Sequence, residues 1–244
     1  MRTEGEHTVL TLIPHEDVVL VGYLVDYQDT GTTRICVKSK PVLGTSDQPL
    51  AGITVALDPG HGGNDPGSLG IGGSQAPVEK DINLTSALAV RQYLQGLGAT
   101  VVMTRDDDSK YQLEEILQFF RDPSIDFCIS LHSNSIFHGD GTQASGVEIF
   151  QYDPGSRNFA ELLQHAVIAH TGRKDRSVKT DYYKVTLNSL TPTVLLEMGF
   201  VSNPAEYDAL RSPDGIYALA AATGDALVAA LSDPMPLSAE TFPA

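Results

Sequence analysis

The chain has 244 residues and an apolar content of 41%, which is enough for a sizeable hydrophobic core and excludes a disordered polypeptide. Asp and Glu number 31 against 16 Lys and Arg, and the net charge of −15 excludes a nucleic-acid-binding protein, which needs a basic face to replace phosphate counterions. The same charge opposes docking on an anionic membrane. We therefore expect a globular protein without nucleic-acid partners.

Cysteine content and hydropathy narrow the class of protein further. The two cysteines, Cys36 and Cys128, exclude a disulfide framework and a zinc site built from cysteines. No apolar stretch approaches the roughly 18 residues of a membrane span, so we expect no span. The early apolar run Val18–Val25 has no basic flank and no small-residue cleavage site. If the protein is exported, we expect the export signal to lie outside this chain.

Residues 1–50 are expected to form a β-rich appendage or the end of a neighbouring module. Short runs rich in β-branched and aromatic residues alternate with turn-forming residues. These runs are Thr8–Ile13, Val18–Tyr27 and Thr32–Lys38. Three strands of this size are marginal alone, which favours packing against a larger body. Val42–Gly52 is predicted to be a linker.

From residue 53 onward, predicted strands alternate with predicted helices. The strands are expected at 53–57, 99–104, 125–131, 147–152, 183–186 and 193–196. One helix is expected to begin within Val78–Asp81 and to end at Gly96. Further helices are expected over residues 109–121 and 156–170, from residue 203, and over residues 215–231. This alternation predicts an α/β domain over residues 51–232, with a sheet flanked by helices on both faces. Residues 233–244 contain three prolines and are expected to form a flexible tail.

The segment Asn203-Pro204-Ala205-Glu206 predicts a helix start in detail. Asn is a favoured N-cap residue and Pro is favoured at the first helical position. Glu206 stands three residues after the cap, where its side chain can return to the N-cap amide and complete a capping box.

Residues able to do chemistry gather at predicted strand ends. His61, His132 and Glu197 each follow or end a buried strand, and Glu79 opens the first helix of the α/β domain. Functional side chains of α/β sheets collect at these carboxyl ends. Two imidazoles and a carboxylate are a common ligand set for catalytic zinc, and a further Glu can then act as general base. Asp65 is a rival carboxylate ligand.

Each of these residues also has a structural interpretation. A lone His at a strand end is more often hydrogen-bonded than metal-bound, and an acid in a first helical turn, such as Glu79, commonly serves the helix dipole. Glu197 follows the apolar run Val194–Leu196, where an acid is costly unless it is paired, metal-bound or protonated. The pattern alone therefore leaves the metal ligands open.

At these residues the sequence resembles the zinc-dependent N-acetylmuramoyl-L-alanine amidases of bacterial cell-wall turnover, the family known as amidase type 3. Six segments carry the resemblance, in family order, between residues 53 and 231. They are Ile53–Gly67, Glu79–Leu84, Val101–Arg105, Ile129–Ser135, Gly146–Phe150 and Pro192–Asn203.

The resemblance implies a twisted, mainly parallel sheet and assigns roles to the polar residues. It implies that His61, Glu79 and His132 ligate one Zn²⁺ per chain and that Glu197 is the catalytic acid–base group. Substrate contacts are expected from Asn134 and Arg176. The implied reaction is hydrolysis of the amide between N-acetylmuramic acid and L-alanine in peptidoglycan, outside the cell, in the wall or periplasm.

Two alternatives to this reaction remain. One is a non-catalytic cell-wall-binding module with the same fold, and the other is a zinc peptidase that cuts within the stem peptide. An acidic chain gains no attraction to an anionic wall, so we also expect a wall-targeting module outside this chain.

Overall fold

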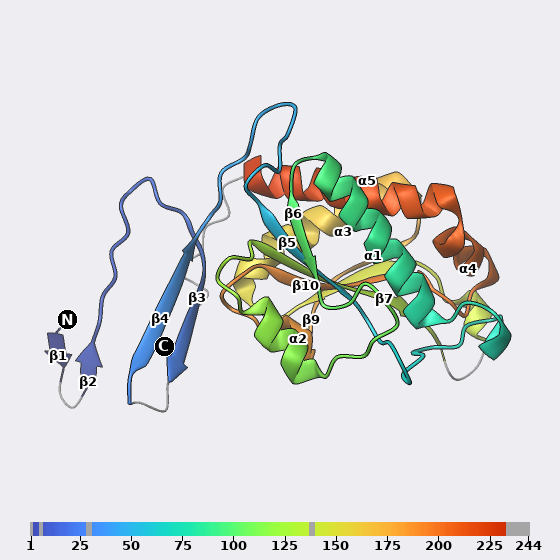
Figure 1. Ribbon diagram of the computed structural model, residues 1–244, viewed down its shortest axis with the longest axis horizontal. Coiled ribbons are helices and arrows are strands. Elements are labelled where there is room, and N and C mark those ends of the chain that lie inside the picture. The colour runs from blue at the N-terminus through green and yellow to red at the C-terminus, as the bar shows by residue number, and fades with distance from the viewer. Residues whose placement is uncertain (1, 5–6, 28–30, 137–139, 233–244) are drawn as a thin grey trace.

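The fold is built on a central sheet of six strands (Figure 1). The computed structural model describes residues 2–4, 7–27, 31–136 and 140–232. Across the sheet the strands are β6 (Thr100–Met103), β5 (Thr54–Pro59), β7 (Phe127–Asn134), β10 (Thr193–Phe200), β8 (Val147–Gln151) and β9 (Asp175–Thr180). The first four run parallel, whereas β8 pairs antiparallel with β10 and parallel with β9. The predicted mainly parallel sheet is confirmed.

Helices cover both faces of this sheet, as predicted (Figure 1). One face packs against α1 (Glu79–Gly96), α3 (Arg157–Thr171), α4 (Pro204–Arg211) and α5 (Pro213–Ser232). The other face lies under α2 (Leu113–Phe120) and the 3₁₀ helix η4 (Lys184–Thr186). The smaller elements are β1 (Arg2–Glu4), β2 (His7–Val9), β3 (Leu20–Tyr27), β4 (Thr33–Ser39), η1 (Gly73–Gln75), η2 (Gly141–Gln143) and η3 (Pro154–Ser156).

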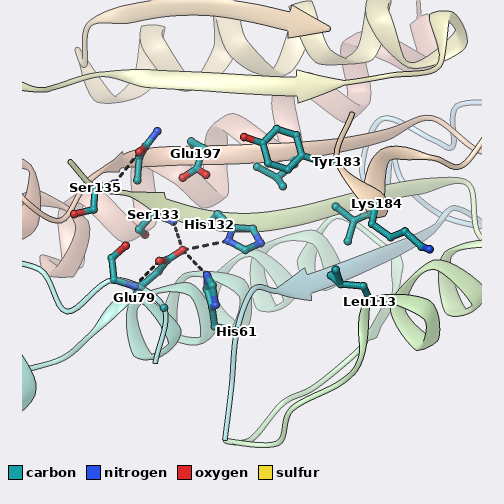
Figure 2. Close-up of a pocket in the computed structure, with 14 residues that line it drawn as sticks. His61, Glu79, Leu113, His132, Ser133, Ser135, Tyr183, Lys184 and Glu197 are labelled. Carbon is teal, nitrogen blue, oxygen red and sulfur yellow. Dashed lines mark hydrogen bonds and ion pairs between the residues drawn. The ribbon is translucent and has the colours of Figure 1, made fainter. Parts of the chain in front are cut away.

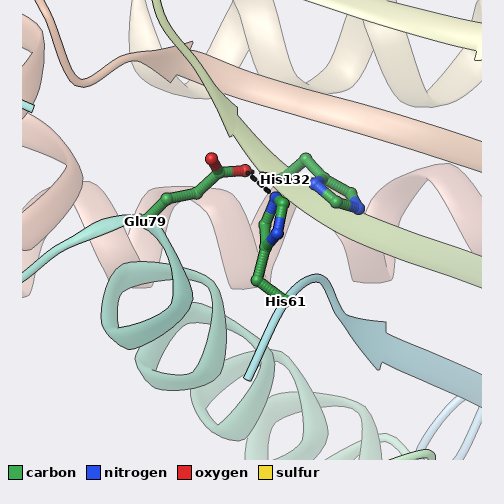
Figure 3. A group of neighbouring side chains, drawn as sticks. All are labelled: His61, Glu79 and His132. Carbon is green, nitrogen blue, oxygen red and sulfur yellow. Dashed lines mark hydrogen bonds and ion pairs between the residues drawn. The ribbon is translucent and has the colours of Figure 1, made fainter. Parts of the chain in front are cut away.

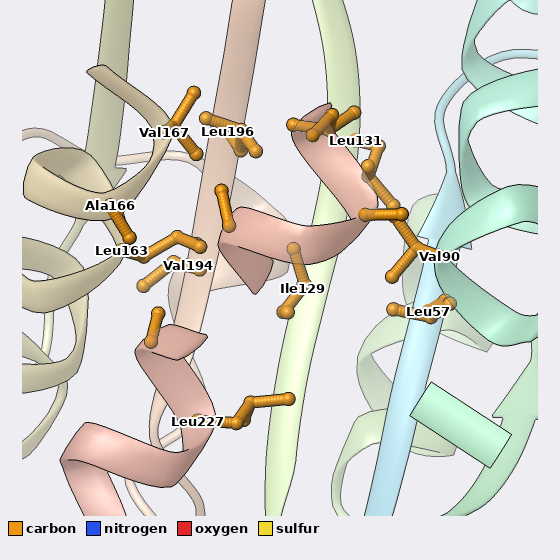
Figure 4. Close-up of a cluster of buried hydrophobic side chains, with 14 of the residues drawn as sticks. Leu57, Val90, Ile129, Leu131, Leu163, Ala166, Val167, Val194, Leu196 and Leu227 are labelled. Atoms are coloured by element: carbon orange, nitrogen blue, oxygen red, sulfur yellow. The ribbon is translucent and has the colours of Figure 1, made fainter. Parts of the chain in front are cut away.

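The two faces of the sheet carry separate hydrophobic cores, because neighbouring residues of a strand point to opposite sides. Val194 and Leu196 of β10 join the large core under α1, α3 and α5, whereas Leu195 joins a smaller core under α2. Figure 4 shows the large core, where Leu163 of α3 and Leu227 of α5 meet the strands. Both leucines are fully buried, so truncating either to alanine costs about 2–5 kcal/mol.

Helix α5 overturns the expectation that no segment has the length and hydropathy of a membrane span. Its 20 residues include an 18-residue window with a mean hydropathy of 1.4. Asp225 interrupts the apolar run, but a single acid lowers that mean only slightly. In the fold 56% of the window is buried, and Leu219, Ala222 and Leu227 lie in the large core. Within the part of the chain that the structure describes, α5 is a core helix packed on α1 and α3.

The N-terminal segment forms the β3–β4 hairpin, which packs beside the sheet (Figure 1). The Tyr23 amide donates to the Ser189 carbonyl at 2.8 Å. Lys38 Nζ lies 3.0 Å from a carboxylate oxygen of Asp126, and Val21 is buried in the large core. The hairpin thus contacts the segments that lead into β7 and β10, at the end of the sheet where these two strands begin.

Two elements of the α/β domain differ from the prediction. Residues 183–186 were expected to form a strand but form η4, because the Thr186 amide donates to the Tyr183 carbonyl at 3.0 Å and closes a turn. Strand β9 was not predicted. It is an edge strand whose residues are exposed or half-buried and mostly polar, so it lacks the apolar alternation that marks a strand.

Two predictions concern the ends of the chain. The strand expected over Thr8–Ile13 is shorter and earlier, since β2 covers only His7–Val9. The expected tail, residues 233–244, lies outside the described residues. The division of the chain near residue 50 stays a prediction.

Helix α4 begins at its predicted N-cap but lacks the predicted capping box. Asn203 Oδ1 accepts hydrogen bonds from the amides of Ala205 at 3.0 Å and Glu206 at 3.2 Å. The Glu206 carboxylate accepts instead from the amides of Gly146 at 2.8 Å and Phe200 at 2.7 Å. Glu206 therefore ties the start of β8 to the end of β10. Its carboxylate is engaged there and does not accept from the amide of Asn203, the N-cap residue of α4.

Candidate active site

Three side chains from three elements converge at the carboxyl edge of the sheet (Figure 3). His61 follows β5, His132 lies near the end of β7, and Glu79 is the first residue of α1. Glu79 Oε1 lies 3.1 Å from His61 Nε2 and 3.1 Å from His132 Nδ1. One possible ligand atom from each residue lies within 4.8 Å of the others. These residues could hold one metal ion, and their donor atoms are those typical of catalytic zinc.

The loop that carries His61 has an unusual backbone. The φ angle of His61 is +66°, in the left-handed region that costs a non-glycine residue about 1–2 kcal/mol. The backbones of Gly62 and Asp65 exchange two hydrogen bonds of 3.0 Å, which hold the loop in this shape. Asp65 Oδ1 lies 3.2 Å from His61 Nδ1, the ring nitrogen that does not face Glu79. Asp65 therefore orients the ring and keeps Nε2 directed at Glu79.

A buried arginine joins the segments that carry His61 and Glu79. Arg105, just after β6, is only 4% exposed. Its guanidinium donates to four main-chain carbonyls, those of Pro59 (2.8 Å), Gly60 (3.2 Å), Lys80 (2.9 Å) and Asp107 (2.9 Å). The first two carbonyls directly precede His61 and the third directly follows Glu79. Arg105 thus fixes the spacing between the loop and the helix.

Two further buried polar groups fix the strand ends beneath the histidines. Asn83 Nδ2 donates to the Gly60 carbonyl at 3.2 Å, and Asn83 Oδ1 accepts from Ser133 Oγ at 2.9 Å. The Asp58 carboxylate accepts from two hydroxyl groups at 2.7 Å, those of Thr104 and Ser130. Because a buried polar network with every partner in place is rigid, the ligand-bearing residues rest on a fixed base.

The Glu79 carboxylate favours protons on both histidines. Burial opposes a charge on His61, but the hydrogen bonds and charges of Glu79 and Asp65 raise its pKa to about 9. Burial likewise opposes a charge on His132, yet the Glu79 hydrogen bond and the Glu197 charge leave its pKa raised. Burial works to raise the pKa of Glu79, but hydrogen bonds to the two imidazoles hold that pKa well below its usual range. A divalent cation would take the place of these protons.

Glu197 lies beside His132 on the neighbouring strand, where the two residues are register partners. Its Oε2 atom is buried and has no hydrogen-bond partner among the described residues. Burial raises the pKa of Glu197 to about 7; the charge of His132 opposes this shift, and the charges of Glu79 and Glu148 add to it. A carboxyl group that titrates near neutral pH can both accept and donate a proton, as a general acid–base must.

Asn134 and Arg176, the expected substrate contacts, meet at a buried glutamate. The Glu148 side chain is 5% exposed, and Glu148 is the register partner of Glu197 on β8. Its carboxylate accepts from Asn134 Nδ2 at 2.6 Å and Arg176 Nε at 3.0 Å, and also pairs with Lys179. Burial works to raise the pKa of Glu148, but Lys179 and Arg176 hold that pKa below its usual range. These residues form one hydrogen-bonded group next to Glu197.

A cavity of about 400 Å³ opens over the site, within the usual size range of ligand-binding pockets (Figure 2). Its wall includes His61, Glu79, His132, Asn134, Tyr183 and Glu197. Figure 2 shows Glu197 and Tyr183 on the side of the cavity away from Glu79. Arg176 is not part of this wall and reaches it only through Glu148 and Asn134. The structure therefore brings the predicted metal ligands and Glu197 into one cavity and places Arg176 at its flank.

Sequence reasoning missed Glu148, Arg105 and Asn83 as parts of the site. Glu148 carried a usable signal, because it interrupts the apolar run Val147–Phe150 just as Glu197 follows one. The apolar pattern gave no such signal for the other two, because Arg105 follows a strand and Asn83 lies in a helix, positions where a polar residue is ordinary. Both lie in segments that carry the family resemblance, which was the signal that could have found them.

Comparison with known proteins places the chain in a family. Residues 55–229 match the family model described as N-acetylmuramoyl-L-alanine amidase. The chain is similar to the N-acetylmuramoyl-L-alanine amidase LytC of Bacillus subtilis, with 33% identity over 178 residues, which are 71% of this chain and 34% of LytC. The chain thus spans about a third of the length of that curated relative.

Solved structures show the same similarity in three dimensions. The catalytic domain of CwlV, an N-acetylmuramoyl-L-alanine amidase from Bacillus (Paenibacillus) polymyxa var. colistinus, superposes with a TM-score of 0.68 at 29% identity, over 74% of this chain and 98% of that domain. The N-acetylmuramoyl-L-alanine amidase of Clostridium difficile 630 gives 0.69 at 27% identity, over 74% and 97%.

Proposed function

The chain belongs to the N-acetylmuramoyl-L-alanine amidase family, and from this premise we propose that it hydrolyses the amide between N-acetylmuramic acid and L-alanine in bacterial peptidoglycan. The observation that carries the proposal is the convergence of His61, Glu79, His132 and Glu197 on one cavity. Because the chain covers only part of LytC, the activity is proposed for the domain of residues 51–232.

Zinc is the proposed cofactor, with one ion per chain held by His61, Glu79 and His132. Support comes from the donor set, since two imidazole nitrogens and a carboxylate oxygen lie within 4.8 Å of one another. Asp65 is assigned to orienting His61, because its carboxylate meets the ring nitrogen away from the other two ligands. When bound, zinc would act as a Lewis acid that polarises the amide carbonyl and lowers the pKa of water.

Glu197 is the acid–base group of the proposed reaction. Its Oε2, which has no partner among the described residues, accepts a proton from water as the new C–O bond forms. The same oxygen then gives that proton to the alanine nitrogen as the C–N bond breaks. Burial makes the protonated form of Glu197 easy to reach, so neither transfer is strongly uphill.

Asn134 and Arg176 are proposed to bind the substrate. Asn134 lines the cavity, and its amide is anchored to Glu148 on one side. Arg176 is anchored to Glu148 through Nε and keeps the outer edge of its guanidinium for a ligand. A planar guanidinium held in this way is suited to a carboxylate.

The proposed site of action is extracellular, in the cell wall or periplasm, with wall targeting supplied by a module outside this chain. The net charge of −15 supports a separate module, because an acidic domain gains no attraction to an anionic wall. Residues 1–50 are proposed as an appendage that packs on the catalytic domain through β3 and β4.

Digestion of purified peptidoglycan followed by mass spectrometry tests the function. We expect new N-terminal L-alanine and glycan strands freed of peptide, no products after treatment with a chelator, and release at least about a hundredfold slower from Glu197→Gln. Shortened stem peptides would instead identify a zinc peptidase. Binding to peptidoglycan without any new ends would identify a non-catalytic binding module.

A further inference from the structure

We propose that Arg176 and Lys179, held in place by Glu148, form a binding subsite for a free carboxylate on the peptide of the substrate. The inference rests on the proposed function and deepens it, because it names the charge that would be recognised beside the scissile amide. Four features of the structure support it: the unused donors of the two cations, the Phe200 ring beneath Arg176, the bulge that aims both cations, and their place relative to Glu197.

The two cations have hydrogen-bonding capacity to spare. Arg176 uses only Nε, which donates to Glu148 at 3.0 Å, and neither Nη atom has an acceptor among the described residues. Lys179 Nζ has Glu148 as its one hydrogen-bond partner in that part of the chain. The side chains are 31% and 40% exposed, so a ligand can reach both. Both cations share the single carboxylate of Glu148, so a second carboxylate would give each cation a partner of its own.

The guanidinium of Arg176 is also fixed from beneath. Its Cζ atom lies 4.8 Å from the centre of the Phe200 ring, which allows a cation–π contact. With Nε held by Glu148 and one face on Phe200, the group loses little freedom when an anion binds. The two Nη atoms form the outer edge, which can donate side by side to both oxygens of a carboxylate.

A β-bulge aims both cations at Glu148. Along β8, Val147 and Ile149 are two residues apart, whereas their partners on β9, Asp175 and Val178, are three apart. The extra residue gives Ser177 a φ of +68°. In a regular strand residues 176 and 179 would point to opposite faces, because they are an odd number of positions apart. The bulge re-aims one of them, so both reach the same carboxylate, as bulges do beside many active sites.

The subsite lies at a distance that a short peptide can span. Glu197, Glu148 and the two cations lie on β10, β8 and β9, which are adjacent in that order. Strands are spaced about 4.8 Å apart, so β9 lies about 10 Å from β10, and the Arg176 side chain reaches back toward β8. At about 3.3 Å per extended residue, a carboxylate on the second peptide residue after the scissile amide would come within reach.

A matched pair of substrates tests this subsite. N-acetylmuramoyl peptides would carry either a free carboxylate or a primary amide on the second residue, and kcat and KM would be measured for each. For the wild type we expect kcat/KM at least about tenfold higher for the carboxylate, as for one charge-assisted hydrogen bond. Lys179→Met should reduce that preference to less than about threefold, with the loss in KM. Lys174→Met, which removes an exposed lysine just before β9, should keep the preference.

Calorimetry keeps this test separate from the proposed function. The corresponding peptides, carboxylated and amidated, would be titrated into Glu197→Gln. If the wild type cleaves neither substrate, the proposed function fails, and a carboxylate preference in binding still supports the subsite. Equal cleavage or equal binding of the two forms would overturn the subsite, as would a Lys179→Met variant that is impaired equally on both.

Discussion

A single methyl group at Gly67 should disable the metal site. Gly67 has a φ of +64°, and a Cβ atom there would lie 2.6 Å from Glu79 Oε2 and 2.7 Å from His61 Cδ2. Ordinary contact begins near 3.4 Å, so in Gly67→Ala both ligands must retreat by about 0.7–0.8 Å. Metal sites tolerate about 0.2 Å, and even indirect disturbance of a ligand costs 10–100-fold in affinity. We expect zinc affinity to fall at least about a hundredfold.

Gly172→Ala is the matched control for this substitution. Gly172 has a φ of +65° at the end of α3, and a Cβ atom there meets no atom of the described residues within 4 Å. Both variants therefore carry the same left-handed alanine, which costs about 1–2 kcal/mol, but only one disturbs the ligands. Zinc affinity would be measured by competition with a chromogenic chelator, and folding by circular dichroism. A folded Gly67→Ala variant with wild-type zinc affinity would refute the assignment of these ligands.

Three further predictions concern the groups around the ligands. Glu197→Gln should lower kcat by about 10²–10⁴, because Glu197 transfers the protons of the reaction. Zinc affinity, measured by the same competition, should stay as in the wild type. Loss of zinc in this variant would contradict the acid–base role. Arg105→Met should lower the free energy of unfolding by about 3 kcal/mol or more and weaken zinc binding, because four main-chain carbonyls lose their donor. Urea titration checks this against Arg105→Lys, which should recover part of the loss. In metal-free protein, Glu197 has a raised pKa, so between about pH 4.5 and pH 7 the folded protein keeps a proton that the unfolded chain loses. The contribution of Glu197 to the free energy of unfolding therefore falls as the pH rises through this window, by about 3 kcal/mol at most. Wild type and Glu197→Gln should therefore diverge in melting temperature across that window, and parallel curves would contradict the shift.

The strand-end rule predicted much of the site from sequence. His61, His132 and Glu197 were singled out because parallel strands of an α/β sheet end at one edge, and the structure brings all three to that edge. Glu79 was different, since an acid in the first turn of a helix has an ordinary explanation in the helix dipole. Only the family resemblance preferred it to Asp65, and the structure places it between the two histidines.

Errors in the prediction arose where tertiary contacts decide the structure. Glu206 fits a capping box by spacing, but the amides of Gly146 and Phe200 compete for its carboxylate. Strand β9 escaped detection because an edge strand has no apolar alternation, and its bulge at Ser177 depends on the ladder with β8. Pairings of this kind join residues far apart in the chain, so local sequence patterns do not contain them.

Anomalous X-ray diffraction at the zinc absorption edge tests the central claim most directly. Crystals of protein loaded with one equivalent of zinc should show a single strong peak, about 2.0–2.2 Å from a nitrogen of His61, a nitrogen of His132 and a carboxylate oxygen of Glu79. A peak bound by Asp65 in place of Glu79, or no peak at these residues, would contradict the account.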